Sequence, residues 1–283
     1  MRVRIPSEIK VTRAAAEGLR AELATLTPAE WETPGACGIW SVAEVVAHLA
    51  WDMGLYADVI RSELAGDTPR EAAPVLPYAE RKVWIAKEAQ ELLRELGDGL
   101  LAAFDERAQA LLTIFESLAP ADWQRTVAHP SGARSMRSML SVALVELSVH
   151  GWEALHGAGR EAMLPDGCHE PIVEWLPFRL RGAFAAREQL SEPIRYLFVL
   201  TPPLLRTIRL LIYGDRFELD PQFDESGSDV VVTVHPQTYI LAMMGRISWQ
   251  AALDANALGV TGHIPDRRLR ALVAGLSDWF PPG

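Results

Sequence analysis

The stretch Met139-Leu-Ser-Val-Ala-Leu-Val-Glu-Leu-Ser-Val-His150 holds two ionisable residues in a segment that is otherwise mostly apolar. This composition predicts a helix that is buried on most sides. Glu146 and His150 are four residues apart, so on a helix their side chains lie one above the other on a single face. Because a buried carboxylate is costly unless something neutralises it, the pair indicates a divalent metal.

A second helical stretch, which runs from Trp40 to Asp52, supplies a third candidate ligand in His48. Catalytic zinc commonly takes three protein ligands from histidine and carboxylate side chains and leaves a fourth position open. Helix bundles build such sites from inward-facing residues of different helices. We therefore predict that His48, Glu146 and His150 bind a metal.

Two acidic residues follow the histidines by about one helical turn. Asp52 is four residues after His48, and Glu153 is three residues after His150. The ring nitrogen of a metal-binding histidine that does not face the metal commonly donates a hydrogen bond to a carboxylate. Asp52 and Glu153 are therefore predicted to orient the two histidines.

Simpler interpretations exist for single residues. His48 lies at the edge of an apolar stripe, where a histidine is often an ordinary core or surface residue, and Glu146 can instead pair with Arg134 or Arg137. His129, in the loop over 127–132, is interpreted as an exposed histidine that could border the site. The occurrence of three suitable residues on two buried helices favours the metal.

Composition limits the class of protein. The 283 residues are 49% hydrophobic, which is enough for two domains, and the formal net charge of -10 without any basic run argues against a nucleic-acid partner. Two cysteines cannot form a disulfide framework, and the N-terminus has no apolar signal stretch. Nor does any run of about 18 apolar residues occur, so we expect a cytoplasmic protein without a membrane span.

The first 160 residues contain an internal repeat. Leu26-Thr-Pro-Ala-Glu-Trp31 recurs as Leu118-Ala-Pro-Ala-Asp-Trp123, and each copy leads to a serine that can cap a helix, Ser41 and Ser135. The third helical pattern contains two glycines and is either kinked or divided. The pattern predicts a four-helix bundle with helices over 7–26, 41–64, 78–118 and 135–156.

Beyond residue 165 the pattern changes to a helix, then strands, then helices, which predicts a small α+β domain. The whole chain is thus expected to be of the α+β class, with a helical bundle over 1–163 and a second domain over 164–283. Helices are predicted over 167–189, 237–244, 248–256 and 266–280, and strands over 194–201, 207–213, 216–219 and 230–235.

The two repeat copies, the run from Gly38 to Leu49 and the segment Glu146-Leu-Ser-Val-His150-Gly together resemble the DinB-like superfamily. The resemblance covers residues 7–160 and is strongest to its maleylpyruvate isomerase-like, mycothiol-dependent branch. The later segment Gly259-Val-Thr-Gly-His-Ile-Pro-Asp266 is similar to the sterol-carrier-like domain found in the same family.

This resemblance implies a divalent metal, usually zinc, on His48, Glu146 and His150. The metal would hold the sulfur of a low-molecular-weight thiol such as mycothiol as a thiolate, which attacks a small electrophile in a transferase or isomerase reaction. An arginine of the second domain helps bind the acidic substrate in the isomerase. No motif places it here, and Arg267 and Arg268 are the candidates, with Arg246 and Arg270 as others.

Two other functions remain open from the sequence. A metal-bound hydroxide on the same three residues would make a hydrolase. Alternatively, the chain is a non-catalytic protein that binds a lipid or small molecule. The oligomeric state is expected to be a monomer or a homodimer.

Overall fold

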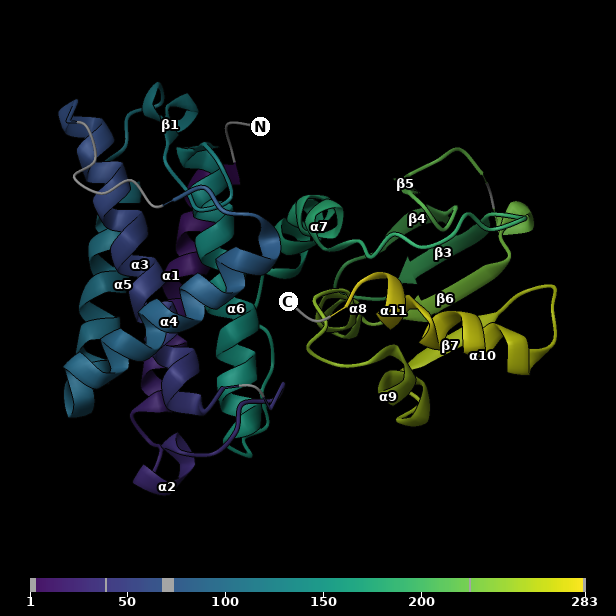
Figure 1. Cartoon of the computed structure of the whole chain (residues 1–283), viewed down its shortest axis with the longest axis horizontal. Coiled ribbons are helices and arrows are strands. Elements are labelled where there is room, and N and C mark those ends of the chain that lie inside the picture. The colour runs from purple at the N-terminus through teal and green to yellow at the C-terminus, as the bar shows by residue number, and fades with distance from the viewer. Residues whose placement is uncertain (1–3, 39, 68–73, 224, 282–283) are drawn as a thin grey trace. The chain divides into compact units, whose positions relative to one another are not determined.

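The computed structural model describes residues 4–38, 40–67, 74–223 and 225–281, and the chain divides into two compact units, 1–172 and 173–283. The first unit is mainly helical and carries a two-stranded sheet of β1 (Thr126–Val127) and β2 (Arg134–Ser135), whereas the second combines a larger sheet with short helices (Figure 1). The predicted α+β class is confirmed.

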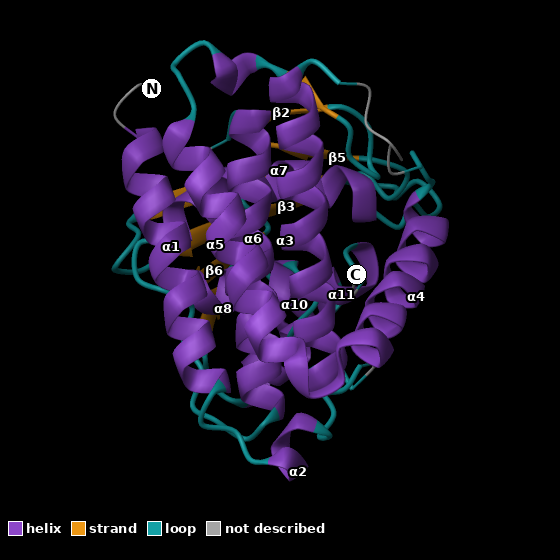
Figure 2. Ribbon diagram, turned by 90° about the vertical axis from the view of Figure 1, so that its left-hand side faces the viewer, coloured by secondary structure: helices purple, strands orange, loops and turns teal. Residues whose placement is uncertain are grey.

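Unit 1 is built from helices that pack side by side (Figure 2). Helix α1 contacts α5 and α6, and α3 contacts α4, α5 and α6, so that α1, α3, α5 and α6 surround a shared core while α4 lies on the outside of α3. The helices of this unit are α1 (Arg4–Leu23), α2 (Pro28–Trp31), α3 (Val42–Ala65), α4 (Tyr78–Leu96), α5 (Leu100–Ser117) and α6 (Met136–Gly157).

The long helical pattern over 78–118 forms two helices. A single 3-10 turn, Gly97–Gly99, separates α4 from α5, and Gly97 has a positive φ of 48° that other residues rarely adopt. This turn lets α5 enter the core while α4 stays on α3. Leu100, Phe104, Leu111 and Phe115 are accordingly buried along one side of α5.

Side-chain caps fix the starts of α3 and α6. The Ser41 hydroxyl accepts a hydrogen bond from the Glu44 amide at 3.2 Å, and the Glu44 carboxylate accepts one from the Ser41 amide at 2.8 Å, which together form a capping box. Ser135 caps α6 by accepting from the Ser138 amide at 3.1 Å. Both predicted caps are confirmed. Because the caps fix where α3 and α6 begin, they also fix which faces of these helices carry His48 and Glu146.

The segment that follows α6 stays attached to unit 1. The Trp152 indole donates a hydrogen bond to the Ala162 carbonyl at 3.1 Å, and Gly167 packs against the side chain of Val11. Helix α7 (His169–Ala183) therefore begins in unit 1 and continues into unit 2. The sequence placed the boundary at 163/164, nine residues before the division.

Unit 2 contains a five-stranded sheet in the order β5-β4-β3-β6-β7. Strand β3 pairs antiparallel with β4 and parallel with β6, and the short edge strand β7 pairs antiparallel with β6. The sequence did not predict β7, which contains Gly259 and alternates between half-buried and exposed residues. The strands are β3 (Ile194–Leu200), β4 (Arg206–Ile212), β5 (Phe217–Leu219), β6 (Val230–Val234) and β7 (Leu258–Thr261).

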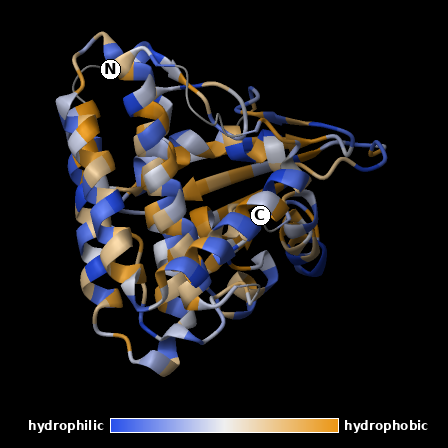
Figure 3. Cartoon of the chain, turned by 60° about the vertical axis from the view of Figure 1, so that its left-hand side comes forward, coloured by the Kyte–Doolittle hydropathy of each residue, from blue (hydrophilic) through white to orange (hydrophobic). Residues whose placement is uncertain are grey.

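Aromatic side chains connect this sheet to its helices. The ring centroid of Phe198 on β3 lies 5.1 Å from that of Tyr239 and 5.6 Å from that of Trp249, and all three side chains are buried. Figure 3 shows the apolar colouring of the central strands. The helices are α8 (Pro236–Met243), α9 (Trp249–Asp254), α10 (Asp266–Ala274) and α11 (Leu276–Trp279).

Among the described helices of both units, none is sufficiently long and apolar to cross a lipid bilayer.

Candidate metal centre

Helices α3 and α6 bring the three predicted ligands together in the core of unit 1. The Nε2 atom of His48 lies 3.5 Å from Glu146 Oε2, and the Nε2 atom of His150 lies 3.2 Å from the same oxygen. The two imidazole rings meet edge to face with centroids 4.7 Å apart. One ligand atom from each residue lies within 4.8 Å of the other two.

The second nitrogen of His150 fixes the tautomer of its ring. The Nδ1 atom lies 3.0 Å from Oε2 of Glu153, a buried carboxylate, so Nδ1 carries a proton and donates it. In the neutral ring the lone pair of Nε2 then faces the Glu146 oxygen. Two electron-rich atoms at this distance repel each other unless a proton or a metal cation lies between them. The arrangement of Glu146, His150 and Glu153 therefore calls for a proton or a metal cation between His150 Nε2 and Glu146 Oε2.

Asp52 is placed differently from Glu153. Its Oδ2 atom lies 3.5 Å from Nε2 of His48, the nitrogen that also faces Glu146, rather than from Nδ1. The buried Nδ1 atom of His48 has no hydrogen-bond partner among the described residues. One turn further along α3 lies Tyr56, whose hydroxyl is close enough to the Asp52 carboxylate for the two groups to shift each other's pKa. Asp52 thus adds a carboxyl group on the same side of the ring as the candidate metal position.

The two carboxyl groups nearest the candidate metal position have pKa values that are shifted in opposite directions. Burial raises the pKa of Asp52 to about 7, because the attraction of His48 does not offset the loss of solvent. Burial also acts to raise the pKa of Glu146, but hydrogen bonds and charge from His150 and His48 outweigh it, so this pKa lies well below its usual range. Burial raises the pKa of Tyr56 far above its normal value. Glu146 is therefore the permanent anion of the centre.

The loop before α3 covers one side of the two histidines. The Trp40 ring lies 5.3 Å from the His48 ring and stacks 6.5 Å from the His150 ring. Two backbone hydrogen bonds position this loop, from the Gly35 amide to the Trp40 carbonyl at 2.7 Å and from the Ala36 amide to the Glu153 carbonyl at 3.1 Å. Trp40 thereby shields the centre from solvent on this side.

The donor set fits a divalent metal such as zinc. Two imidazole nitrogens and one carboxylate oxygen are ligands that catalytic zinc takes, and donors around a tetrahedral zinc lie roughly 3.3 Å apart. The two measured separations from Glu146 Oε2, 3.5 and 3.2 Å, bracket that value. The chemistry of the three residues and the two separations from Glu146 Oε2 therefore match such a site.

Comparison with known proteins assigns the helical unit to a family. Residues 12–155 match the family model described as the mycothiol maleylpyruvate isomerase N-terminal domain. The chain belongs to this family. Membership confirms the resemblance inferred from the sequence motifs, and with it the prediction of an enzyme of the maleylpyruvate isomerase-like kind. No curated protein matches the sequence.

Solved structures show the fold of this maleylpyruvate isomerase family over most of the chain. The crystal structure of a mycothiol-dependent maleylpyruvate isomerase is 16% identical with a TM-score of 0.61, and the match covers 93% of this chain and 95% of that one. A histidine-to-alanine mutant of a mycothiol-dependent maleylpyruvate isomerase gives 14% identity, a TM-score of 0.58 and the same coverage. These likenesses establish a shared fold.

A third structure, the sterol carrier protein-2 like-3 of Aedes aegypti, covers 38% of this chain and 96% of that chain at 13% identity. Its TM-score of 0.28 supports no assignment. The sterol-carrier-like character of unit 2 therefore stays a prediction.

The two arginines that were considered as partners of Glu146 have other contacts. Arg137, one of the two arginines considered for Glu146, instead pairs with the buried Glu8 of α1. Arg134, the other, donates to Ser131 at 2.6 Å. Arg267 and Arg268 are exposed on α10 of unit 2, and their role in substrate binding stays a prediction.

The sequence did not indicate Tyr56 as a site residue, and it led to the interpretation of His129 as exposed. Tyr56 follows Asp52 by four residues on α3, a helical spacing that could have linked it to the site. His129 is half-buried rather than exposed, with its ring centroid 5.7 Å from that of Tyr56. No local signal in the loop sequence indicates this contact, because it depends on how the loop folds back over α3.

Proposed function

We propose that the chain is a metal-dependent enzyme, with zinc as the favoured ion, that uses a low-molecular-weight thiol of the mycothiol type to act on a small electrophile as a transferase or isomerase. The observation that carries this proposal is the convergence of His48 and His150 on one oxygen of Glu146. Membership of the mycothiol maleylpyruvate isomerase family supports the choice of thiol.

The protein side chains define the electrostatics of this centre. His48, Glu146 and His150 would hold the ion, and Glu153 fixes the tautomer of His150 through Nδ1. When bound, a divalent cation keeps the sulfur of a thiol deprotonated at neutral pH. Because the ligand set has one carboxylate and two neutral imidazoles, it cancels only half of the ion's charge and so favours an anionic sulfur.

The reaction class follows from what a thiolate does with an electrophile. The sulfur attacks an electron-poor carbon, and the Trp40 ring beside the two histidines limits the access of water from that side. If the sulfur stays on carbon, the product is a conjugate and the enzyme is a transferase. If the sulfur leaves after rotation about the former double bond, the enzyme is an isomerase.

Metal content tests the first part of the proposal. The full chain, purified without chelator, is expected to contain about one divalent ion per molecule by elemental analysis, and His150→Ala is expected to contain none. Glu161→Gln, an exposed carboxylate outside the centre, is the matched control and should keep its metal. A wild-type protein that stays metal-free after incubation with zinc or cobalt would overturn the proposal and favour a non-catalytic binding protein.

Thiol binding tests the second part. Cobalt-loaded protein titrated with mycothiol, or with a simple thiol such as N-acetylcysteine, should develop a sulfur-to-cobalt charge-transfer band. No such band should appear in His150→Ala. A cobalt protein that shows no band but hydrolyses esters or amides without added thiol would contradict the role of the thiol and support the hydrolase alternative. The cytoplasmic location and the monomeric or dimeric state stay predictions.

A further inference from the structure

The two histidines of the candidate centre differ in how their second ring nitrogen is held. Nδ1 of His150 lies 3.0 Å from the buried carboxylate of Glu153. Nδ1 of His48 is also buried, but it has no hydrogen-bond partner among the described residues. Its Nε2 atom faces Glu146 and Asp52, each 3.5 Å away. The His48 ring therefore lacks the outer hydrogen bond that commonly orients a metal-binding histidine.

Metal binding through Nε2 would place the proton of the His48 ring on Nδ1. A neutral imidazole has one nitrogen with a lone pair and one with a proton, so a cation on Nε2 leaves Nδ1 as a donor. A buried N–H group without an acceptor costs free energy. We therefore looked for a group other than a carboxylate that stabilises this proton and the orientation of the ring.

The indole of Trp40, in the loop before α3, lies against the His48 ring. The two ring centroids are 5.3 Å apart, and the ring planes make an angle of 58°. Tilted aromatic pairs at this separation direct an edge of one ring toward the face of the other. Because the face of an aromatic ring carries partial negative charge, it attracts an N–H group and accepts it weakly.

The same indole meets the His150 ring in a different way. These two planes are 24° apart, with centroids separated by 6.5 Å, so the rings are close to parallel. The planes of His48 and His150 in turn make an angle of 77°. Of the two histidines, His48 is thus the one that turns an edge to its aromatic neighbours, and it is also the one whose Nδ1 has no polar partner in the described part of the chain.

Backbone contacts on both sides hold Trp40 in place. Its carbonyl accepts a hydrogen bond from the Gly35 amide at 2.7 Å, and Ser41, the next residue, caps α3. The Val42 amide donates to the Thr33 carbonyl at 2.9 Å, which joins the two ends of the loop. Because its backbone is already fixed, the indole loses little further conformational entropy when it packs against a neighbouring ring.

We infer that Trp40 is a positioning residue of the metal centre, whose ring face receives the Nδ1–H group of His48 and so holds Nε2 toward the metal position. This inference rests on the proposed function, since it takes Nε2 as the metal-binding atom. The two histidines then have different supports. The Glu153 carboxylate orients His150, and the aromatic face of Trp40 orients His48.

NMR of the zinc-loaded full chain with ¹⁵N-labelled histidine tests this difference. A proton above an aromatic face resonates at lower frequency, whereas a hydrogen bond to a carboxylate moves a proton to higher frequency. The Nδ1–H signal of His48 is therefore expected at lower frequency than that of His150. Trp40→Leu should move the His48 signal to higher frequency and leave the His150 signal in place. Glu153→Gln should do the reverse, which also assigns the two signals.

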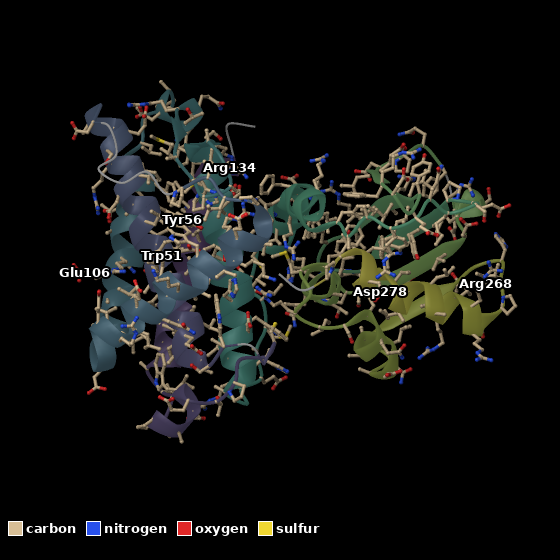
Figure 4. All side chains as sticks on the ribbon, in the orientation of Figure 1. Trp51, Tyr56, Glu106, Arg134, Arg268 and Asp278 are labelled. Atoms are coloured by element: carbon tan, nitrogen blue, oxygen red, sulfur yellow. The ribbon has the colours of Figure 1, made fainter. Side chains whose placement is uncertain are left out.

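Zinc affinity, measured by competition with a chromogenic chelator, is the second readout. Trp40→Leu should weaken zinc binding by about 10-fold or more, the range found when the outer partner of a metal-binding histidine is changed. Trp40→Phe keeps a ring face, so it should keep most of the affinity and a low-frequency His48 signal. Trp84→Leu is the matched control and should behave as the wild type does. Trp84 is a half-buried tryptophan of α4 whose ring lies 5.0 Å from that of Trp51, which Figure 4 labels.

A His48 signal that does not move in Trp40→Leu would overturn the role of Trp40, and so would equal zinc affinity of Trp40→Leu and the wild type. If Trp40→Leu does not fold, as judged by circular dichroism, the His48 signals of the wild type and Trp40→Phe decide, and a frequency equal to that of His150 overturns the inference. A wild-type chain that takes up no zinc overturns the proposed function and this inference together. Zinc uptake with an unmoved His48 signal overturns the inference alone.

Discussion

Gly157 of α6 packs directly against Gly35: a methyl group on Gly157 would lie 2.5 Å from the Gly35 Cα and 2.6 Å from the Pro34 carbonyl oxygen. Only a residue without a Cβ permits this approach. The contact holds the loop that carries Trp40 close to the end of α6, and Trp40 covers both histidines of the candidate centre. Gly157, which lies outside the candidate centre, thus determines how closely Trp40 covers the two histidines.

We expect Gly157→Ala to lower the free energy of unfolding by about 1–3 kcal/mol, the usual cost of overpacking a tight contact. The variant should also bind metal more weakly, because the displaced loop moves Trp40. Thermal unfolding and metal titration measure the two effects. Gly18→Ala on α1 is the control, since no atom lies near its Cβ position and alanine favours the helix. Equal melting temperatures of Gly157→Ala and the wild type would contradict the argument.

Glu153→Gln should reduce metal affinity by about 10–100-fold, the range measured when the partner of a metal-binding histidine is changed. The amide accepts a weaker hydrogen bond from His150 Nδ1 than the buried carboxylate does. Competition with a chromogenic chelator gives the affinity, and Glu161→Gln serves as the exposed control. An affinity equal to that of the wild type would show that Glu153 does not act through His150.

His129 should stay neutral in acid where ordinary histidines become charged. Burial and the charge of Arg134 lower its pKa to about 4, compared with the ordinary value of 6.5. Between these values the unfolded chain binds the additional proton, so the contribution of His129 to stability is complete above pH 6.5 and is lost as the pH falls toward 4. NMR titration of the ring, assigned with His129→Gln, checks this expectation. A midpoint near pH 6.5 would contradict it.

The two cysteines should differ strongly in reactivity. Burial raises the pKa of Cys168 to about 12, whereas Cys37 is half-buried in the loop before α3. At pH 8 the thiolate fraction of Cys168 is about a thousandfold below that of a thiol with a pKa near 9. Iodoacetamide should therefore label Cys37 first, and Cys168 only after unfolding. Because the folded state retains the Cys168 proton, stability from this group is lost as the pH rises from 9 toward 12. Rapid labelling of Cys168 in the folded protein would contradict its burial.

Much of the helical unit could be predicted because its signals are local. Ser41 and Ser135 cap the helices that carry the candidate ligands, and the i, i+4 spacing of Glu146 and His150 determines that they share a face. The contact of His48 with Glu146 and His150 was predicted only from the ligands that a metal needs, because this contact joins two different helices, α3 and α6. The Glu146 carboxylate needs a neutralising partner, and the imidazoles of His48 and His150 lie against it.

The features that were missed depend on tertiary contacts or on very short elements. Strand β7 has four residues and forms only because β6 offers a free edge. The contact of His129 with Tyr56 requires the loop to fold back over α3. Asp52 was expected behind the His48 ring but lies beside Nε2, because the ring rotates to face Glu146 while Asp52 stays one turn along the same helix. Helical spacing predicts proximity but not which ring nitrogen is contacted.

All three candidate ligands and the carboxylate behind His150 come from unit 1. Changes confined to residues 173–283 therefore alter no candidate donor atom of the metal centre.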